Sequence, residues 1–231
     1  MGGLDLGAIL GALSVWTLPV IVAITFHEAA HGYVAWRLGD PTAFVRGRVT
    51  FNPLRHIDPV GTILIPAFLL IAGAPFLFGY AKPVPVNFSR LNNPRRDMVL
   101  VAAAGPGINL ALAVVSALLI HIAAWFPESA AIWLQQNLLN SLIINLVLAV
   151  FNMFPMPPLD GGRVAVGLLP DALAFRLARL ERVGLLIIVG VLFLLPWLTR
   201  EIGLDFNPIE FIIGRPVEFL AHLILTLTGL T

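Results

Sequence analysis

Long runs without any charged residue are the feature that most constrains this chain. Five such runs cover residues 6–26, 59–81, 98–127, 129–159 and 183–199. A helix needs roughly 20 apolar residues to cross the hydrocarbon core of a bilayer. Only 12% of the residues are charged, whereas soluble domains have about 25%. The pattern predicts an all-α polytopic membrane protein with about 4–6 transmembrane helices. We expect a single domain over 1–231, with a core at 7–170 and C-terminal helices at 171–231.

The basic residues gather in three clusters. These are Arg37, Arg46, Arg48 and Arg55; then Lys82, Arg90, Arg95 and Arg96; then Arg163, Arg176, Arg179 and Arg182. Lys and Arg near the ends of spans favour the cytoplasmic side, so one face should carry all three clusters. This arrangement requires helices at about 7–37 and 131–156 that run inward, and helices at 98–124 and 183–199 that run outward.

The apolar run at 59–81 must then not cross the membrane. Pro66, Gly73 and Pro75 interrupt it, as expected for a segment that dips into the bilayer and comes back. We therefore predict a re-entrant segment. An ordinary further span is the alternative, since Pro and Gly are tolerated in membrane helices.

The C-terminal stretch 202–231 mixes apolar and charged residues, and Pro208 and Pro216 divide it into short pieces. This mixture predicts helices that lie at the membrane interface. A shallow final crossing by 217–230 is the alternative.

Two imidazoles lie four residues apart at the end of the first apolar run, in AITFHEAAHGYVAW. On a helix, His27 and His31 share one face, as two ligands of one zinc ion must. Glu28 lies beside them, where a carboxylate can act as base toward a water that the metal activates. Ionisable residues within a span are costly and are functional candidates by default. The alternative is a helix end at the interface, where Glu28 and His31 simply reach water.

Two imidazoles leave a catalytic zinc one protein ligand short. The chain has no cysteine, so the third ligand must be a further His, Asp or Glu. Asp160 is the candidate, because three prolines break the helix before it and two glycines free the backbone after it, in NMFPMPPLDGG. It reaches the depth of His27 only if 59–81 does not cross. The alternative is a solvated Asp in a helix-ending turn.

Other polar and proline-rich features have two interpretations each. Proline alternates over 81–87, which predicts a short β-like edge strand that another extended peptide could join, or a polyproline connector. Asn152 needs hydrogen-bond partners within a span, from a peptide backbone or from a neighbouring helix. Gly105 and Gly107 permit close helix packing, with Asn109 offering an amide to the site or with no role beyond packing. His56 and Asp58 form either a second metal pair or, as we favour, a loop cap.

Three motifs together resemble the signatures of site-2 proteases, the intramembrane zinc metalloproteases. They are HEAAH at 27–31, AGPGIN at 104–109 and NMFPMPPLDGG at 152–162. The stretches FNPLRHIDPVGT and GYAKPVPVN are similar to those of compact prokaryotic members without a PDZ domain. The resemblance covers most of residues 20–170.

The resemblance implies an integral-membrane metalloprotease domain that binds one Zn²⁺. The implied site residues are the ligands His27, His31 and Asp160, the general base Glu28, and the supporting Asn109 and Asn152. It further implies transmembrane helices of other proteins as substrates, in a prokaryotic cell membrane. The basic clusters orient the first helix so that the active site lies toward the cytoplasmic half. The net charge of +1 suggests no nucleic-acid partner. A membrane zinc carrier or a catalytically silent scaffold is the rival function. An intact Glu28 favours the enzyme, because a carrier needs no unligated base.

Overall fold

The computed structural model describes residues 6–71, 79–201, 203 and 207–230. Within these ranges the chain is helical, with no strand, so the all-α prediction is confirmed there. The α-helices are α1 (Leu6–Arg37), α2 (Thr42–Val45), α3 (Ile65–Ile71), α4 (Pro94–Ala123), α5 (Glu128–Asn152), α6 (Asp160–Leu168), α7 (Asp171–Ala178), α8 (Gly184–Val189), α9 (Leu195–Glu201) and α10 (Arg215–Leu227). Short 3₁₀ or π segments are η1 (Pro53–Arg55), η2 (Pro59–Leu64), η3 (Phe88–Arg90), η4 (Arg179–Arg182), η5 (Gly190–Leu194) and η6 (Glu210–Gly214).

Among the described residues, four helices are long and apolar enough to cross a membrane. They are Leu10–Arg37, Pro94–Ala123, Glu128–Asn152 and Gly184–Glu201. The last of them is continuous through α8, η5 and α9. Each coincides with one of the predicted crossings to within a few residues, and the protein is a membrane protein.

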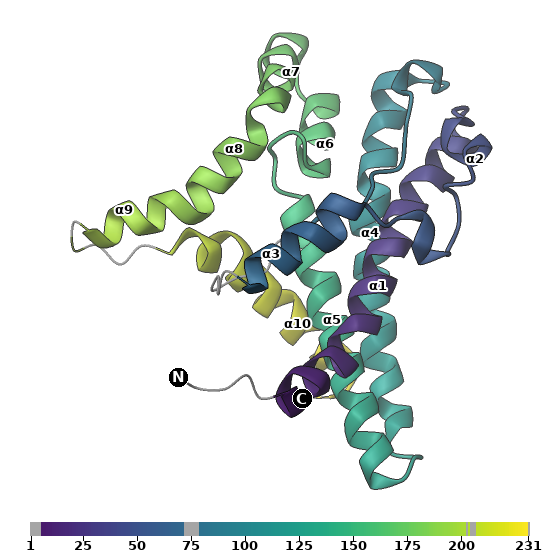
Figure 1. Cartoon of the computed structure of the whole chain (residues 1–231). Coiled ribbons are helices and arrows are strands. Elements are labelled where there is room, and N and C mark those ends of the chain that lie inside the picture. The colour runs from purple at the N-terminus through teal and green to yellow at the C-terminus, as the bar shows by residue number, and fades with distance from the viewer. Residues whose placement is uncertain (1–5, 72–78, 202, 204–206, 231) are drawn as a thin grey trace.

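The core of the molecule is the packing of α1, α4 and α5 against one another (Figure 1). Asn140 of α5 donates to the carbonyl of Val15 early in α1, at 3.1 Å, whereas Asp160, just beyond α5, lies against His27 later in α1. Helices α1 and α5 therefore run in the same direction. Helix α4 runs the opposite way, because its early residue Val101 meets His31 and its later residue Asn109 meets His27. These relative directions agree with the prediction.

Helix α10 completes the core on the other side of α5 (Figure 1). Val217, Ala221 and Ile224 recur at helical spacing and are buried in one cluster with Ala113, Ala117, Leu142 and Leu146. One face of the C-terminal helix therefore contacts protein. The interfacial position expected for 202–231 stays a prediction.

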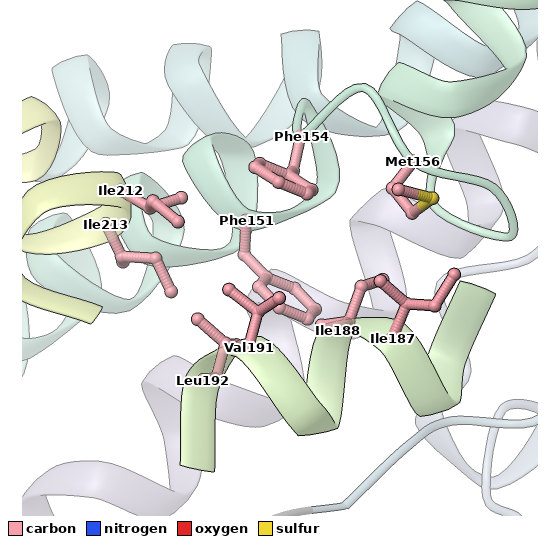
Figure 2. Close-up of a pocket in the computed structure, with 9 residues that line it drawn as sticks. All are labelled: Phe151, Phe154, Met156, Ile187, Ile188, Val191, Leu192, Ile212 and Ile213. Atoms are coloured by element: carbon pink, nitrogen blue, oxygen red, sulfur yellow. The ribbon is translucent and has the colours of Figure 1, made fainter. Parts of the chain in front are cut away.

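The helix formed by α8, η5 and α9 diverges from the three-helix core (Figure 1). Between it, the end of α5 and η6 lies an apolar pocket of about 70 Å³. Figure 2 shows the side chains that line it, among them Phe151, Met156, Ile188 and Ile213, all hydrocarbon apart from one sulfur. No titratable side chain is among the residues that line this pocket, so the pocket provides no acid, base or nucleophile for catalysis.

The apolar run at 59–81 is described only in part, because residues 72–78, with Gly73 and Pro75, lie outside the described residues. Its two ends are hydrogen-bonded to each other. Tyr80 N donates to the carbonyl of Gly61 at 3.1 Å, and Lys82 N donates to the carbonyl of His56 at 2.9 Å. The two ends of the run therefore lie next to each other, while the re-entrant course between them stays a prediction.

The segment 81–87 is extended but forms no strand ladder with any described residue, so the predicted edge strand is not confirmed. Pro83 and Pro85 have no N–H to donate. The N–H of Val84 donates to Oε2 of Glu28 at 2.7 Å. A side chain of α1 therefore takes the hydrogen bond that a neighbouring strand would have made.

Candidate metal centre

Three side-chain atoms from two separate elements converge on one point. The Nε2 atoms of His27 and His31, one turn apart on α1, lie 3.1 Å from each other. Oδ2 of Asp160 lies 3.3 Å from each of them. Ligands bound at about 2.0–2.1 Å in tetrahedral geometry are separated by about 3.3–3.4 Å. The three atoms therefore fit a single zinc ion, and buried Oδ2 has no hydrogen-bond partner among the described residues.

The hydrogen bonds behind the imidazoles determine which nitrogen faces the metal position. Nδ1 of His31 lies 2.7 Å from the carbonyl oxygen of Val101, which can only accept, so Nδ1 carries the proton. Nε2 of His31 then has a free lone pair. An imidazole with this tautomer is ready to ligate a metal without losing a proton.

The tautomer of His27 is determined through a chain of buried amides. Nδ1 of His27 lies 2.6 Å from Oδ1 of Asn109. Nδ2 of Asn109 donates to the carbonyl of Ala23 at 3.2 Å and to Oδ1 of Asn145 at 2.7 Å. Nδ2 of Asn145 donates in turn to the carbonyl of Ser141 at 2.8 Å. Because these carbonyls only accept, both amides have one allowed orientation, and Asn109 accepts from His27.

Gly105 of α4 is required by the closeness of that helix to α1. A Cβ at Gly105 would collide with Nε2 of His31 and with Cε1 of His27. A Cβ at Gly107 would meet nothing within 4 Å. The close packing expected of both glycines is therefore observed at Gly105 and not at Gly107.

Asp160 reaches the imidazoles because α5 ends at Asn152 and α6 begins at Asp160 itself. The turns between them bring the chain so close to itself that a Cβ at Gly161 would collide with the carbonyl of Met153. Asp160 is buried, and its Oδ2 faces Nε2 of both imidazoles. A carboxylate oxygen and two nitrogen lone pairs that face one point are the donor set of a single metal ion.

Glu28 lies beside these three residues without joining them. It lines the same cavity, of about 280 Å³, as His27, His31 and Asp160, but it is outside the group whose atoms converge. Its Oε2 accepts from Val84 N, and Oε1 accepts no hydrogen bond from any described residue. The arrangement leaves a carboxylate oxygen available next to the metal position.

The remaining predicted polar residues separate into two groups. Asn152 lines the cavity and donates to the carbonyl of Leu148 in its own helix, at 3.0 Å. Asp58 caps η2 by accepting from Val60 N and Gly61 N, and His56 is bonded to the carbonyl of Thr50. The loop-cap interpretation of this pair is therefore supported, and neither residue lies in the convergent group.

Two supports of the site were not identified from the sequence. Asn145 orients Asn109, and Arg48 donates to the carbonyl of Lys82 at 2.6 Å, next to the segment that contacts Glu28. The only signal for Asn145 was an amide within an apolar run, the same signal that singled out Asn152.

The fold and the site define a class: a membrane protein with a His, His, Asp group between its helices that is suited to hold a metal ion. Comparison with known proteins narrows this class to a family. The chain is 42% identical over 183 residues, 78% of this chain and 80% of the other, to "Putative zinc metalloprotease YwhC" of Bacillus subtilis. It therefore belongs to this zinc metalloprotease family.

More distant relatives have the same kind of name. "Putative zinc metalloprotease Rip2" of Mycolicibacterium smegmatis is 32% identical over 78% of this chain and 66% of its own. "Putative zinc metalloprotease MJ0611" of Methanocaldococcus jannaschii is 33% identical over 60% of this chain and 62% of its own. No family model matches the chain, and no solved structure matches it.

Proposed function

We propose that this protein is an intramembrane endopeptidase of the HExxH type, similar to site-2 proteases, that cleaves transmembrane helices of other proteins. The observation that carries the proposal is the convergence of His27, His31 and Asp160 beside an unligated Glu28, at the end of a membrane-spanning helix. The family membership supports zinc as the metal and peptide hydrolysis as the reaction.

Each residue of the site has a separate role in the proposed reaction. His27, His31 and Asp160 would hold one zinc ion, which when bound would supply Lewis-acid polarisation of a carbonyl and lower the pKa of water to about 7. Glu28 takes the proton of the attacking water at Oε1 and delivers it to the leaving amine. The N–H of Val84 holds the other oxygen, Oε2, and so orients the carboxylate. Asn152, which lines the cavity, offers its amide to the substrate backbone.

We propose further that 59–81 is re-entrant and that the site lies toward the cytoplasmic half of a prokaryotic membrane. The bonds from Tyr80 to Gly61 and from Lys82 to His56 support the return of the chain to its starting side. The second and third basic clusters also contact each other's segments, at the end of the molecule that contains the site. Arg95 donates to the carbonyl of Gly167, and Arg163 lies over the ring of Phe88.

The extended segment 81–87 is proposed as the border along which an unwound substrate lies. Val84 and Val86 both line the cavity, and Val86 N–H donates to no described residue. Replacing Val86 by Pro removes this donor and should depress cleavage while zinc remains bound. Val84→Pro would also remove the hydrogen bond to Glu28, so it would not separate strand pairing from the orientation of Glu28. Full turnover by Val86→Pro would exclude strand pairing.

The decisive experiment is Glu28→Gln in the full chain, reconstituted with a model transmembrane substrate. Gln keeps the size and the Val84 contact but cannot take a proton. We expect normal zinc content and loss of cleavage by at least about 100-fold, the range of a general base. His27→Ala and Asp160→Ala should lose the metal. Cleavage retained by Glu28→Gln would leave a zinc carrier or a scaffold as the function.

A further inference from the structure

Four cationic side chains line one pocket next to the metal centre. Arg46, Arg48, Arg55 and Lys82 surround a cavity of about 430 Å³, together with aliphatic and proline side chains. No acidic residue is among the residues that line it. The pocket is separate from the cavity of the metal centre but shares Pro83 with it.

None of these four cations forms an ion pair with any described residue. The Arg pairs that do occur are Arg95 with Asp171 and Arg163 with Glu181, on other elements. Burial and the charge of Arg55 lower the pKa of Arg48, and the charge of Glu28 raises it, but Oε2 of Glu28 is already bonded to Val84 N. The pocket therefore has a surplus of positive charge.

Arg48 is the residue that most requires a ligand. Only 8% of its surface is exposed. Its Nη2 donates to the carbonyls of Lys82 and Pro83, at 2.6 and 3.5 Å, while its buried Nε has no hydrogen-bond partner in the part of the chain that the structure describes. A buried donor of a charged group is costly to leave unsatisfied. A guanidinium offers paired donors that match the oxygens of phosphate.

The surroundings of the pocket indicate where this phosphate comes from. Leu54, which lines it, is 72% exposed, and the nearby Val45 and Phe51 are also exposed. Exposed apolar side chains beside Lys and Arg are typical of surfaces that enter the headgroup region of a bilayer. A soluble phosphate gains nothing from these apolar neighbours, whereas the acyl chains of a lipid do.

We propose that the pocket formed by Arg46, Arg48, Arg55 and Lys82 binds the phosphate group of an anionic phospholipid. A bound lipid would also contact the segment that holds Glu28. Arg48 holds the carbonyls of Lys82 and Pro83, and the next residue, Val84, donates to Glu28. The binding claim is independent of the proposed proteolysis.

The test measures lipid binding to the purified full chain in detergent, by native mass spectrometry with short-chain phosphatidylglycerol. The pocket variant is Arg46→Gln with Arg55→Gln, because both residues are exposed and neither side chain makes a hydrogen bond to a described residue. Arg48 is left intact so that Lys82 and Pro83 stay in place. The control is Arg176→Gln with Arg182→Gln, which removes two charges from exposed positions on other elements.

We expect the apparent Kd for phosphatidylglycerol to rise about tenfold or more in the pocket variant, and less than about twofold in the control. Phosphatidylcholine and inorganic phosphate should compete poorly. Equal weakening in both variants would mean only a diffuse positive surface and would overturn the proposal. Competition by inorganic phosphate, or by a soluble acidic peptide, at similar concentration would also overturn it, in favour of that ligand.

Discussion

At the scale of single residues, the orientation of His27 depends on a side chain that none of the recognised motifs includes. Asn145 accepts from Asn109 at 2.7 Å and so keeps Oδ1 of Asn109 toward the imidazole. Without that acceptor, the Asn109 amide could turn and offer a donor to His27 instead. The residue acts through Asn109 and is a positioning residue for the metal ligand.

Asn145→Leu should therefore weaken zinc binding by about 10–100-fold, the usual cost of losing a partner behind a ligand. Competition with a chromophoric chelator measures this directly. Asn140→Leu is the matched control, since the Asn140 side chain donates to the carbonyl of Val15, away from the metal, and bonds no other described residue. Equal affinities in the two variants would refute the positioning role.

Gly105 and Gly107 provide a second test at single positions. Gly105→Ala should displace one or both imidazoles and release zinc, because its Cβ would occupy their space. Gly107→Ala should leave zinc content and folding almost unchanged, because its Cβ enters open space. Metal analysis of the two purified variants compares them, and a Gly105→Ala protein with full zinc would contradict the observed packing of α1 on α4.

At the scale of elements, the turn after α1 is hydrogen-bonded to the segment 81–87, which borders the site. Fully buried Asp40 accepts from Thr42 N at 3.0 Å, from Oγ1 of Thr42, and from Asn87 N at 2.6 Å. Gly39, with φ +109°, supplies the left-handed turn before it. Burial alone would raise the pKa of Asp40. The hydrogen bonds and the charge of Arg90 lower it by more than burial raises it, so the pKa lies below its ordinary value.

This lowered pKa makes the stabilisation by Asp40 and its hydrogen bonds sensitive to acid. The unfolded Asp takes up its proton near pH 3.9 and the folded one at lower pH, so Asp40 stabilises the fold above about pH 4 and loses this effect as pH falls further. Asp40→Asn should lower Tm at pH 6, at a cost of about 1–3 kcal/mol for the unsatisfied Asn87 N–H. The Tm difference from wild type should shrink by pH 3. A constant difference across this range would exclude linkage through Asp40.

At the scale of the whole molecule, the topology is open to direct test because the natural chain has no cysteine. Single cysteines at Leu54 and Ser89, on either side of 59–81, should react with an impermeant maleimide from the same, cytoplasmic face. A cysteine at Ser129, in the first turn of α5, should react from the other face. All three positions are exposed. Labelling of Leu54 and Ser89 from opposite faces would mean that 59–81 crosses.

The helical class, the four helices long and apolar enough to cross a membrane, and the relative directions of α1, α4 and α5 were predictable from the sequence, because they depend on runs of apolar residues and on where basic residues fall. The grouping of His27, His31 and Asp160 was predictable for a related reason. Helical spacing places the two imidazoles on one face, and a proline-rich break frees the carboxylate to turn inward.

Only the tertiary structure decided which donors and acceptors meet across helices. The edge strand expected at 81–87 was not confirmed, because Val84 N bonds the carboxylate of Glu28, which is 56 residues away. The amide chain from Asn145 to His27 and the distinct roles of Gly105 and Gly107 likewise depend on how α1, α4 and α5 approach one another. The sequence alone determined the spans and the ligand types, which follow from local periodicity. The orientation of each ligand depends on contacts between distant segments, which periodicity does not encode.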